Sequence, residues 1–223
     1  MIDVFLAVVE NPTPVRDAFT LATVRQWETL LGPAPNHLWI RSFGPNHRDR
    51  LAWAAEHMTA DWGVVADDDC LLRPLAIKST FKSNPEPWNE YVARIFGARP
   101  DLGMVSALPE PHNTPQHTWR WLRTHHPEQV EVWTDVPAIG GIRFVRRDVL
   151  RALVEALPAE GPNHNYDREV ICPLLRQQGW QIGYLPALPC FHLGFGNSAV
   201  GRWTGYRANW QDGRLVAPPT ALA

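Results

Sequence analysis

Short apolar runs alternate with amphipathic segments along the first third of the chain. Runs that are apolar on both faces are typical of buried strands, and an apolar repeat of about 3.6 residues is typical of helices. The pattern predicts strands over residues 2–9, 37–42 and 62–66, and helices over 14–31 and 47–58. Thr13 and Asn46 stand at the N-cap positions of the two helices, and Gly32 stops the first. This alternating order favours a parallel α/β sheet.

The rest of the chain continues the pattern less regularly. Further strands are predicted over 102–107, 130–136, 139–145, 180–185 and 190–193, and further helices over 88–96, 148–157 and 167–178. Asp148 is the predicted cap of the middle one of these helices. The segment 109–126 is rich in Pro, His and Trp without a clear period, and we expect a loop or flap there. Because no segment has the composition of an interdomain linker, we expect a single domain.

The composition excludes several classes of protein. Hydrophobic residues make up 45% and charged residues 20%, as in globular chains, and a net charge of −2 provides no general attraction for nucleic acid or anionic membranes. Three scattered cysteines are too few for a disulfide framework or a zinc site. The first apolar run, of about seven residues, lacks the basic flank and cleavage site of a signal peptide. No apolar stretch approaches the ~20 residues of a membrane span. We therefore expect a cytoplasmic location.

Three consecutive aspartates, Asp67, Asp68 and Asp69, directly follow the predicted strand 62–66. In open α/β sheets, ligands bind at the carboxyl ends of the strands. Carboxylates crowded there are costly unless a cation neutralises them, and Mg²⁺ or Mn²⁺ binds carboxylates together with phosphate oxygens. The cluster therefore predicts a divalent metal site, and the alternative is a solvated turn with capping aspartates.

An apolar strand that ends in Asp-x-Asp resembles the metal and nucleotide motif of glycosyltransferases with the GT-A fold, specifically those like family 2. Four further segments occur in that family's order: Glu10-Asn11-Pro12 at the first nucleotide-binding loop, Arg50-Leu51-Ala52 at an Arg-Asn-x-Gly-x-x-x-Ala segment, 139–147 at the strand beneath the acceptor, and 167–186 at a helix–Gly–strand–Pro segment. The Asn and Gly of the second segment are absent here. The resemblance extends over about residues 2–195, and the order of the segments carries it.

The resemblance implies a single-domain α/β GT-A fold, which is Rossmann-like, with a mixed, mostly parallel sheet flanked by helices. Residues 1–108 would form the nucleotide-sugar half and 109–195 the acceptor half, and the tail 196–223 would close over the donor. The implied reaction moves a sugar from a nucleoside-diphosphate sugar, with a UDP-sugar favoured, to an acceptor hydroxyl. Mn²⁺ or Mg²⁺ would act as a Lewis acid on the departing diphosphate.

The resemblance also implies site residues. Metal ligation falls to Asp67, Asp69 and His192, and nucleotide-sugar binding falls to Val9, Glu10, Asn11, Arg50, Asp67, Asp68, Gly140, Gly141 and Arg202. His192 follows a short apolar strand and precedes a Gly-rich run that suits a diphosphate. A histidine in this setting is about as often a hydrogen-bonded core residue, so both interpretations stay open.

An inverting transfer needs a general base for the acceptor hydroxyl. Asp167 and Glu169 are the candidates, at the start of the helix that stops at Gly179. Asp167 falls where the family has Glu, and Arg168 falls where it has its usual catalytic Asp. We prefer Asp167 because it precedes the helix body. Both acids also suit the first turn of a helix, and without a base a retaining transfer stays open.

Arginine and tryptophan are abundant. The 21 basic residues comprise two Lys and 19 Arg, beside 11 Trp, and either codon bias or contact with phosphates and sugar rings explains the excess. Candidates for such contacts are Arg202, Trp203, Arg207, Trp210 and Arg214 in the tail, Trp119 and Trp121 in the flap, and Arg41, Arg48 and Arg50 around the second helix. For each group, packing or a solvated face is the alternative.

Two other functions stay open. A nucleotidyltransferase that forms a nucleotide-sugar would share the fold and the metal, but its Gly-rich loop with Arg and Lys is absent from the segment ENPTPVR. A non-catalytic module that binds a sugar or nucleotide would fit the Trp content. The acceptor is open between a glycan, a lipid-linked sugar, a protein and a modified DNA base, the last by analogy with phage DNA modification. The oligomeric state is not predicted.

Overall fold

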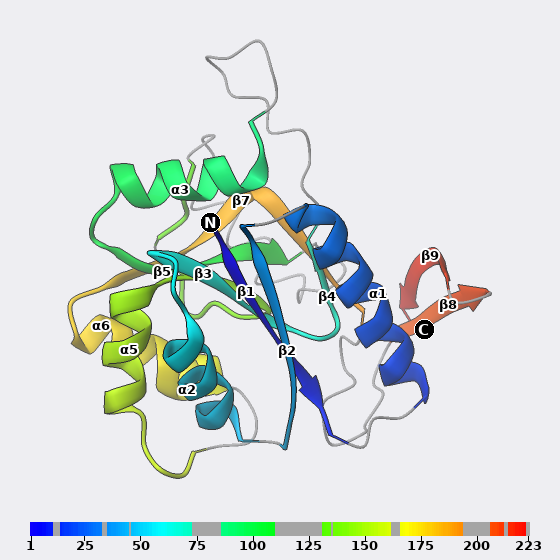
Figure 1. Cartoon of the computed structure of the whole chain (residues 1–223), viewed down its shortest axis with the longest axis horizontal. Helices are drawn as coiled ribbons and strands as arrows, with labels where there is room; N and C mark the ends of the chain where they lie inside the picture. The colour runs from blue at the N-terminus through cyan, green and yellow to red at the C-terminus, as the bar shows by residue number, and fades with distance from the viewer. Residues whose placement is uncertain are drawn as a thin grey trace.

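A seven-stranded mixed sheet forms the centre of the molecule (Figure 1). The computed structural model describes residues 1–10, 14–32, 35–44, 46–72, 86–109, 131–134, 136–161, 166–193, 206–211 and 214–221. In sheet order the strands are β2 (His37–Phe43), β1 (Asp3–Val9), β3 (Trp62–Asp67), β6 (Ile142–Arg146), β5 (Leu102–Pro109), β7 (Gln181–His192) and β4 (Cys70–Leu72). Strands β6 and β4 run antiparallel to the others. This sheet confirms the predicted mixed, mostly parallel α/β architecture.

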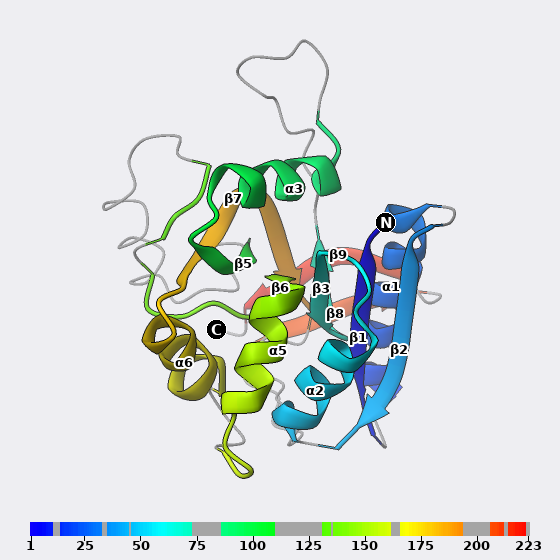
Figure 2. The same cartoon turned by 60° about the vertical axis from the view of Figure 1, so that its left-hand side comes forward.

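Helices cover both faces of the sheet and give three layers (Figure 2). On one face lie α1 (Pro14–Leu31) and α3 (Trp88–Ala98), and on the other lie α2 (His47–His57), α5 (Arg147–Ala156), the π-helical segment η2 (Asp167–Ile171) and α6 (Cys172–Gln177). Successive side chains of a strand point to opposite faces, so each face buries its own apolar cluster. In β1, Phe5 packs with the α2 side, whereas Val4 and Leu6 pack with the α1 side.

Local chemistry sets the helix ends much as the sequence predicts. The side chain of Asn46 accepts a hydrogen bond from the Arg48 N–H at 3.0 Å, which confirms it as the N-cap of α2. Gly32 follows α1 with φ +63°, and Gly179 follows α6 with φ +87°. Glycine adopts this left-handed backbone without a Cβ clash, and it therefore ends a helix. The predicted N-cap Thr13 lies outside the described residues.

The prediction that Asp148 caps α5 is wrong. The helix begins at Arg147, directly after β6, with Arg146 at the N-cap and Asp148 in the first turn. The Arg146 guanidinium donates to the carbonyls of Leu102 and Phe96, so this residue completes the strand before the helix starts. Asp148 still faces the positive end of the helix dipole.

Three predicted strands have different bounds. Strand β6 covers 142–146, which is shorter at its start than the predicted 139–145. The two predicted segments 180–185 and 190–193 form the single strand β7, because a register shift after Leu185 accommodates the prolines between them. In the described part of 130–136, only Trp133 pairs, in a bridge to Tyr184, and Pro137 then lacks the N–H of a continued ladder.

The sequence pattern did not predict three of the strands. The short strand β4 follows the aspartates and pairs with the end of β7. Strands β8 (Tyr206–Gln211) and β9 (Arg214–Ala221) form a two-stranded antiparallel sheet within the predicted tail. The predicted flap lies outside the described residues beyond Pro109. Within the described part of the chain, no helix is long and apolar enough to cross a membrane.

Candidate active site

The three aspartates lie where β1 and β3 end side by side. Asp67 is the last residue of β3 and pairs in register with Ala7 of β1. Asp68 and Asp69 form the turn into β4, and their side chains are only 1% and 2% exposed. Because the parallel strands β1, β2 and β3 end at one edge, this edge gathers the carboxylates and the loops around them.

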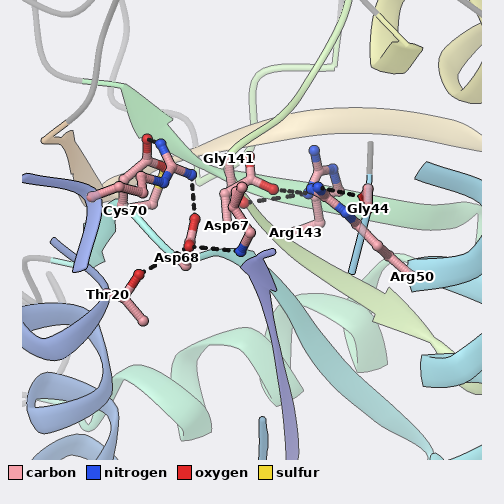
Figure 3. Close-up of polar contacts among 11 residues, drawn as sticks. Thr20, Gly44, Arg50, Asp67, Asp68, Cys70, Gly141 and Arg143 are labelled. Atoms are coloured by element: carbon pink, nitrogen blue, oxygen red, sulfur yellow. Dashed lines mark hydrogen bonds and ion pairs between the residues drawn. The ribbon is translucent and has the colours of Figure 1, made fainter. Parts of the chain in front are cut away.

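Arg16, in the first turn of α1, binds both buried aspartates. Its two terminal nitrogens form ion pairs with Asp68 Oδ1 and Asp69 Oδ2. Asp68 Oδ2 also accepts from the Val9 N–H at 3.1 Å and from the Thr20 hydroxyl at 2.9 Å (Figure 3). The acidic turn is thus tied to β1 and α1 by charge and by hydrogen bonds, and the alternative of a solvated turn does not describe Asp68 or Asp69.

Burial and neighbouring charges act in opposite directions on the pKa values of this group. Burial raises the pKa of Asp68, the Arg16 charge lowers it, and the charge of Asp69 raises it again, with a raised pKa as the result. Burial alone would lower the pKa of Arg16, but the two carboxylates raise it above its usual value. One guanidinium thus binds two buried carboxylates.

A second arginine, Arg143 of β6, joins Asp167 to Asp67. Its Nε and Nη2 donate to the two oxygens of Asp167 at 2.8 and 2.6 Å, and its Nη1 lies 3.4 Å from Asp67 Oδ1. The side chain of Arg143 is buried, whereas Asp67 and Asp167 are 28% and 22% exposed. Burial alone would lower the pKa of Arg143, and the charges of the two carboxylates hold it well above its usual value. The fork therefore fixes two partly exposed carboxylates at one edge.

Gly140 and Gly141 make this arrangement possible. A Cβ on Gly140 would stand 3.0 Å from Asp167 Oδ2, which is closer than ordinary contact. Gly141 has φ +75°, and its carbonyl accepts from the Asp67 N–H at 3.1 Å. Gly140 thus leaves room for the Asp167 carboxylate, and the Gly141 carbonyl binds the backbone of Asp67. That these glycines contact a nucleotide-sugar stays a prediction.

The two candidate bases differ in position. Asp167 lies in the cluster through Arg143. Glu169 is exposed, and its side chain forms no hydrogen bond or ion pair with another residue of the described chain. The geometry favours Asp167 as the acid that faces the site.

The other predicted nucleotide-binding residues surround the same edge. The Val9 N–H donates to the Asp68 carboxylate, and the Glu10 N–H donates to the Phe43 carbonyl at 3.1 Å. Arg50 of α2 donates to the Gly44 carbonyl at 3.3 Å (Figure 3). The predicted residues Asn11 and Arg202, and the tail residue Trp203, lie outside the described residues.

The acidic cluster has the ligand chemistry of a divalent cation site. Asp67 and the Arg16-bound pair provide carboxylate oxygens, which hard cations favour. In the register of β4 and β7, His192 pairs with Cys70, the residue that follows Asp69. The His192 side chain lies outside the part of the chain that the structure describes. Among the described residues no three His, Cys, Asp or Glu side chains already converge as a metal site. The residues fit a cation, and ligation by Asp67, Asp69 and His192 stays a prediction.

The N-terminal end of α2 forms the opposite side of the cluster. The His47 ring stacks on Tyr166, with ring centres 5.1 Å apart and planes at 11°. Burial lowers the pKa of His47, the charges of Arg50 and Arg143 lower it further, and Asp67 and Asp167 act in the opposite direction. The net result is a His47 pKa below its ordinary value, which favours the neutral imidazole.

Sequence reasoning missed Arg16, Arg143, His47 and Tyr166 as site residues. Arg143 left a signal, because a lone charge inside the apolar run Ile142 to Val145 needs a buried partner. The other three left none, because their partners lie on other elements.

Comparison with known proteins supports the fold and leaves the chemistry open. No protein-family model and no curated protein sequence matches the chain. Among solved structures, it is similar to a mannosyltransferase from Pyrobaculum calidifontis, solved in complex with GDP-mannose and Mn²⁺, at 14% identity and a TM-score of 0.54. The match covers 86% of this chain and 56% of that one, so the chain spans little over half of that enzyme's length.

Two further structures align less closely. One is a glucosyl-3-phosphoglycerate synthase from Mycobacterium tuberculosis, at 13% identity, a TM-score of 0.47, and 86% and 71% coverage of the two chains. The other is a CMP:2-keto-3-deoxy-manno-octonic acid synthetase, at 13% identity, a TM-score of 0.46, and 82% and 88% coverage. The mannosyltransferase likeness shows the GT-A-like fold, which confirms the predicted fold class. Fold likeness at this identity does not establish a reaction.

Proposed function

We propose that the chain is a glycosyltransferase that moves a sugar from a nucleoside-diphosphate sugar to an acceptor hydroxyl. The observation that carries the proposal is the edge itself: in a GT-A-like fold, Asp67 to Asp69 and Asp167 meet at the carboxyl ends of the parallel strands. That the similar mannosyltransferase was solved with GDP-mannose and Mn²⁺ adds support.

Asp167 is the proposed general base. Each of its oxygens accepts from Arg143 and keeps a further lone pair, so it can accept the proton of an acceptor hydroxyl as that oxygen attacks the sugar carbon. The bond from that carbon to the diphosphate breaks, and the transfer inverts the configuration. Arg143 fixes the orientation of the carboxylate.

The donor diphosphate belongs at the Asp67–Asp69 end. Mn²⁺ or Mg²⁺ bound there by Asp67, Asp69 and His192 would neutralise charge on the diphosphate. Arg16 provides one positive charge at this end, where it is paired with Asp68 and Asp69. We propose a UDP-sugar as the first donor to test, with the acceptor open between glycan, lipid-linked sugar, protein and DNA base.

The test is donor turnover by purified protein with a panel of UDP-, GDP- and other nucleotide-sugars, with Mn²⁺, Mg²⁺ or EDTA. Asp167→Asn removes the base and is expected to lower the turnover number about 10²–10⁴-fold, while donor affinity changes little. Glu169→Gln and the exposed Asp148→Asn serve as matched controls and should retain turnover.

Three outcomes would contradict the proposal. Undiminished turnover in Asp167→Asn would remove the base assignment. Release of pyrophosphate from a nucleoside triphosphate and a sugar phosphate would instead identify a nucleotidyltransferase. Tight binding without turnover of any nucleotide-sugar would identify a binding module.

A further inference from the structure

Buried hydrogen-bond donors that lack acceptors occur in the first turns of α2 and on Tyr166, whose ring stacks on the first residue of that helix. The Nε atoms of Arg48 and Arg50 and the hydroxyl of Tyr166 are inaccessible to solvent and have no hydrogen-bond partner among the described residues. A buried donor without an acceptor costs about 1–3 kcal/mol, and more when it is charged. Two of the three atoms belong to guanidinium groups, which pair best with negatively charged acceptor oxygens.

The charge of these arginines is also uncompensated. Arg16 and Arg143 each pair with two carboxylates, but neither Arg48 nor Arg50 forms an ion pair with a carboxylate of the described chain. Both are half-buried. Nearby, Asp67 and Asp167 are already bound by Arg143, and Glu10 is exposed. The end of α2 therefore holds two arginines without an ion pair among the described residues, beside the exposed Asp49.

Tyr166 places its hydroxyl at this end of the helix. The side chain is 4% exposed, and its ring stacks on His47, the first residue of α2. Burial raises the pKa of Tyr166, and the charge of Arg48 lowers it. Figure 3 shows Arg50 and Arg143 reaching toward the same place beside Gly44 and Asp67.

We propose that the N-terminal end of α2, with Arg48, Arg50 and Tyr166, is an oxyanion-binding site for a phosphate or carboxylate group. Two guanidinium groups, a phenol and the positive end of an 11-residue helix provide the donors that such a group requires.

The anion has two possible sources, and naming them rests on the proposed function. If the chain transfers a sugar, the group belongs either to the acceptor, which is then a phosphorylated or carboxylated molecule, or to the diphosphate of the donor. Both sources use the same donors, and binding measurements separate them.

The experiment measures binding of inorganic phosphate by calorimetry, in EDTA and at constant ionic strength. Arg48→Gln and Arg50→Gln are expected to weaken binding about tenfold or more each, and Tyr166→Phe about two- to tenfold. Arg25→Gln, at an exposed arginine of α1, is the control and should bind as the parent does. Circular dichroism confirms that each variant folds.

Absence of saturable phosphate binding, or equal binding by all four variants, would overturn the proposal. The same variants are then titrated with UDP, GDP and glycerol 3-phosphate. If the nucleotides lose affinity, the anion is the donor diphosphate; if only phosphate and glycerol 3-phosphate lose affinity, it belongs to the acceptor. Phosphate binding needs no turnover, so an inactive enzyme that binds phosphate would contradict the proposed function alone.

Discussion

Single side chains decide how charge is held at the edge of this sheet. Arg16 neutralises part of the negative charge of Asp68 and Asp69, and Arg143 binds Asp167 and Asp67. A buried charge that loses its partner costs about 3–5 kcal/mol, so these arginines stabilise the fold as well as arranging the site. The same logic applies at the opposite end of β1, where Asp3 is fully buried.

Asp3→Asn is expected to lower the free energy of unfolding by about 2–3 kcal/mol at pH 7. Burial alone would raise the pKa of Asp3, but hydrogen bonds from the Ala60 and Thr59 N–H groups, the Thr59 hydroxyl and His37 lower it to about 2. Urea unfolding at several pH values measures the effect. Asp61→Asn, at a side chain 96% exposed, is the control.

The pH dependence of this difference has a definite sign. A carboxylate with a lowered pKa in the folded protein stabilises it fully above its unfolded value of 3.8. Its contribution is lost as the pH falls from there to about 2, because protonation removes the charge that the folded state favours. The gap between parent and Asp3→Asn should therefore narrow over that window. A gap that stays constant with pH would contradict this account.

At the level of elements, the loop before β6 allows η2 to approach β3. Gly140 leaves room for the Asp167 carboxylate, and Gly141 turns the backbone so that its carbonyl meets the Asp67 N–H. Strand β6 runs between β3 and β5, and it brings Arg143 to the carboxylates of two different elements. The position of the candidate base thus depends on a backbone contact.

Gly140→Ala is expected to displace Asp167, because its Cβ would stand 3.0 Å from an oxygen that Arg143 holds in place. We expect a loss of about 1 kcal/mol in stability and about tenfold or more in turnover. Gly97→Ala in α3 is the matched control, since nothing lies within 4 Å of its new Cβ; it should gain about 0.5–1 kcal/mol. Full turnover in Gly140→Ala would show that the position of Asp167 is not critical.

For the whole molecule, the acidic edge should link stability to divalent cations. Mn²⁺ at about 100 times its dissociation constant would stabilise the fold by about 2.7 kcal/mol and raise Tm by about 5–10 °C. Asp69→Asn should reduce the shift. Arg16→Gln should enlarge it, because the cation then replaces the lost guanidinium charge.

Thermal unfolding with Mn²⁺, Mg²⁺ and EDTA measures these shifts. Arg16→Lys keeps the positive charge and should therefore show a Mn²⁺ shift close to that of the parent. Asp148→Asn is the surface control. An equal Mn²⁺ shift in parent, Asp69→Asn and Asp148→Asn would place the cation elsewhere.

Much of the architecture follows from local pattern. The apolar runs that became β1, β2 and β3, and the caps at Asn46 and Gly32, act over a few residues, where steric and hydrogen-bonding preferences are strong. The pattern was less reliable for α5 and for the segment around Trp133, where contacts with distant strands overrode it.

The candidate site divides in the same way. The aspartates after β3 and the acid at position 167 could be identified along the chain, because strand ends and helix starts are local features. Their partners could not: Arg16 lies 52 residues from Asp68, and Arg143 lies 24 residues from Asp167. Charged side chains find partners across the edge where strands of different sequence order meet. Only the folded sheet determines which charges are paired and which, at Arg48 and Arg50, are left for a ligand.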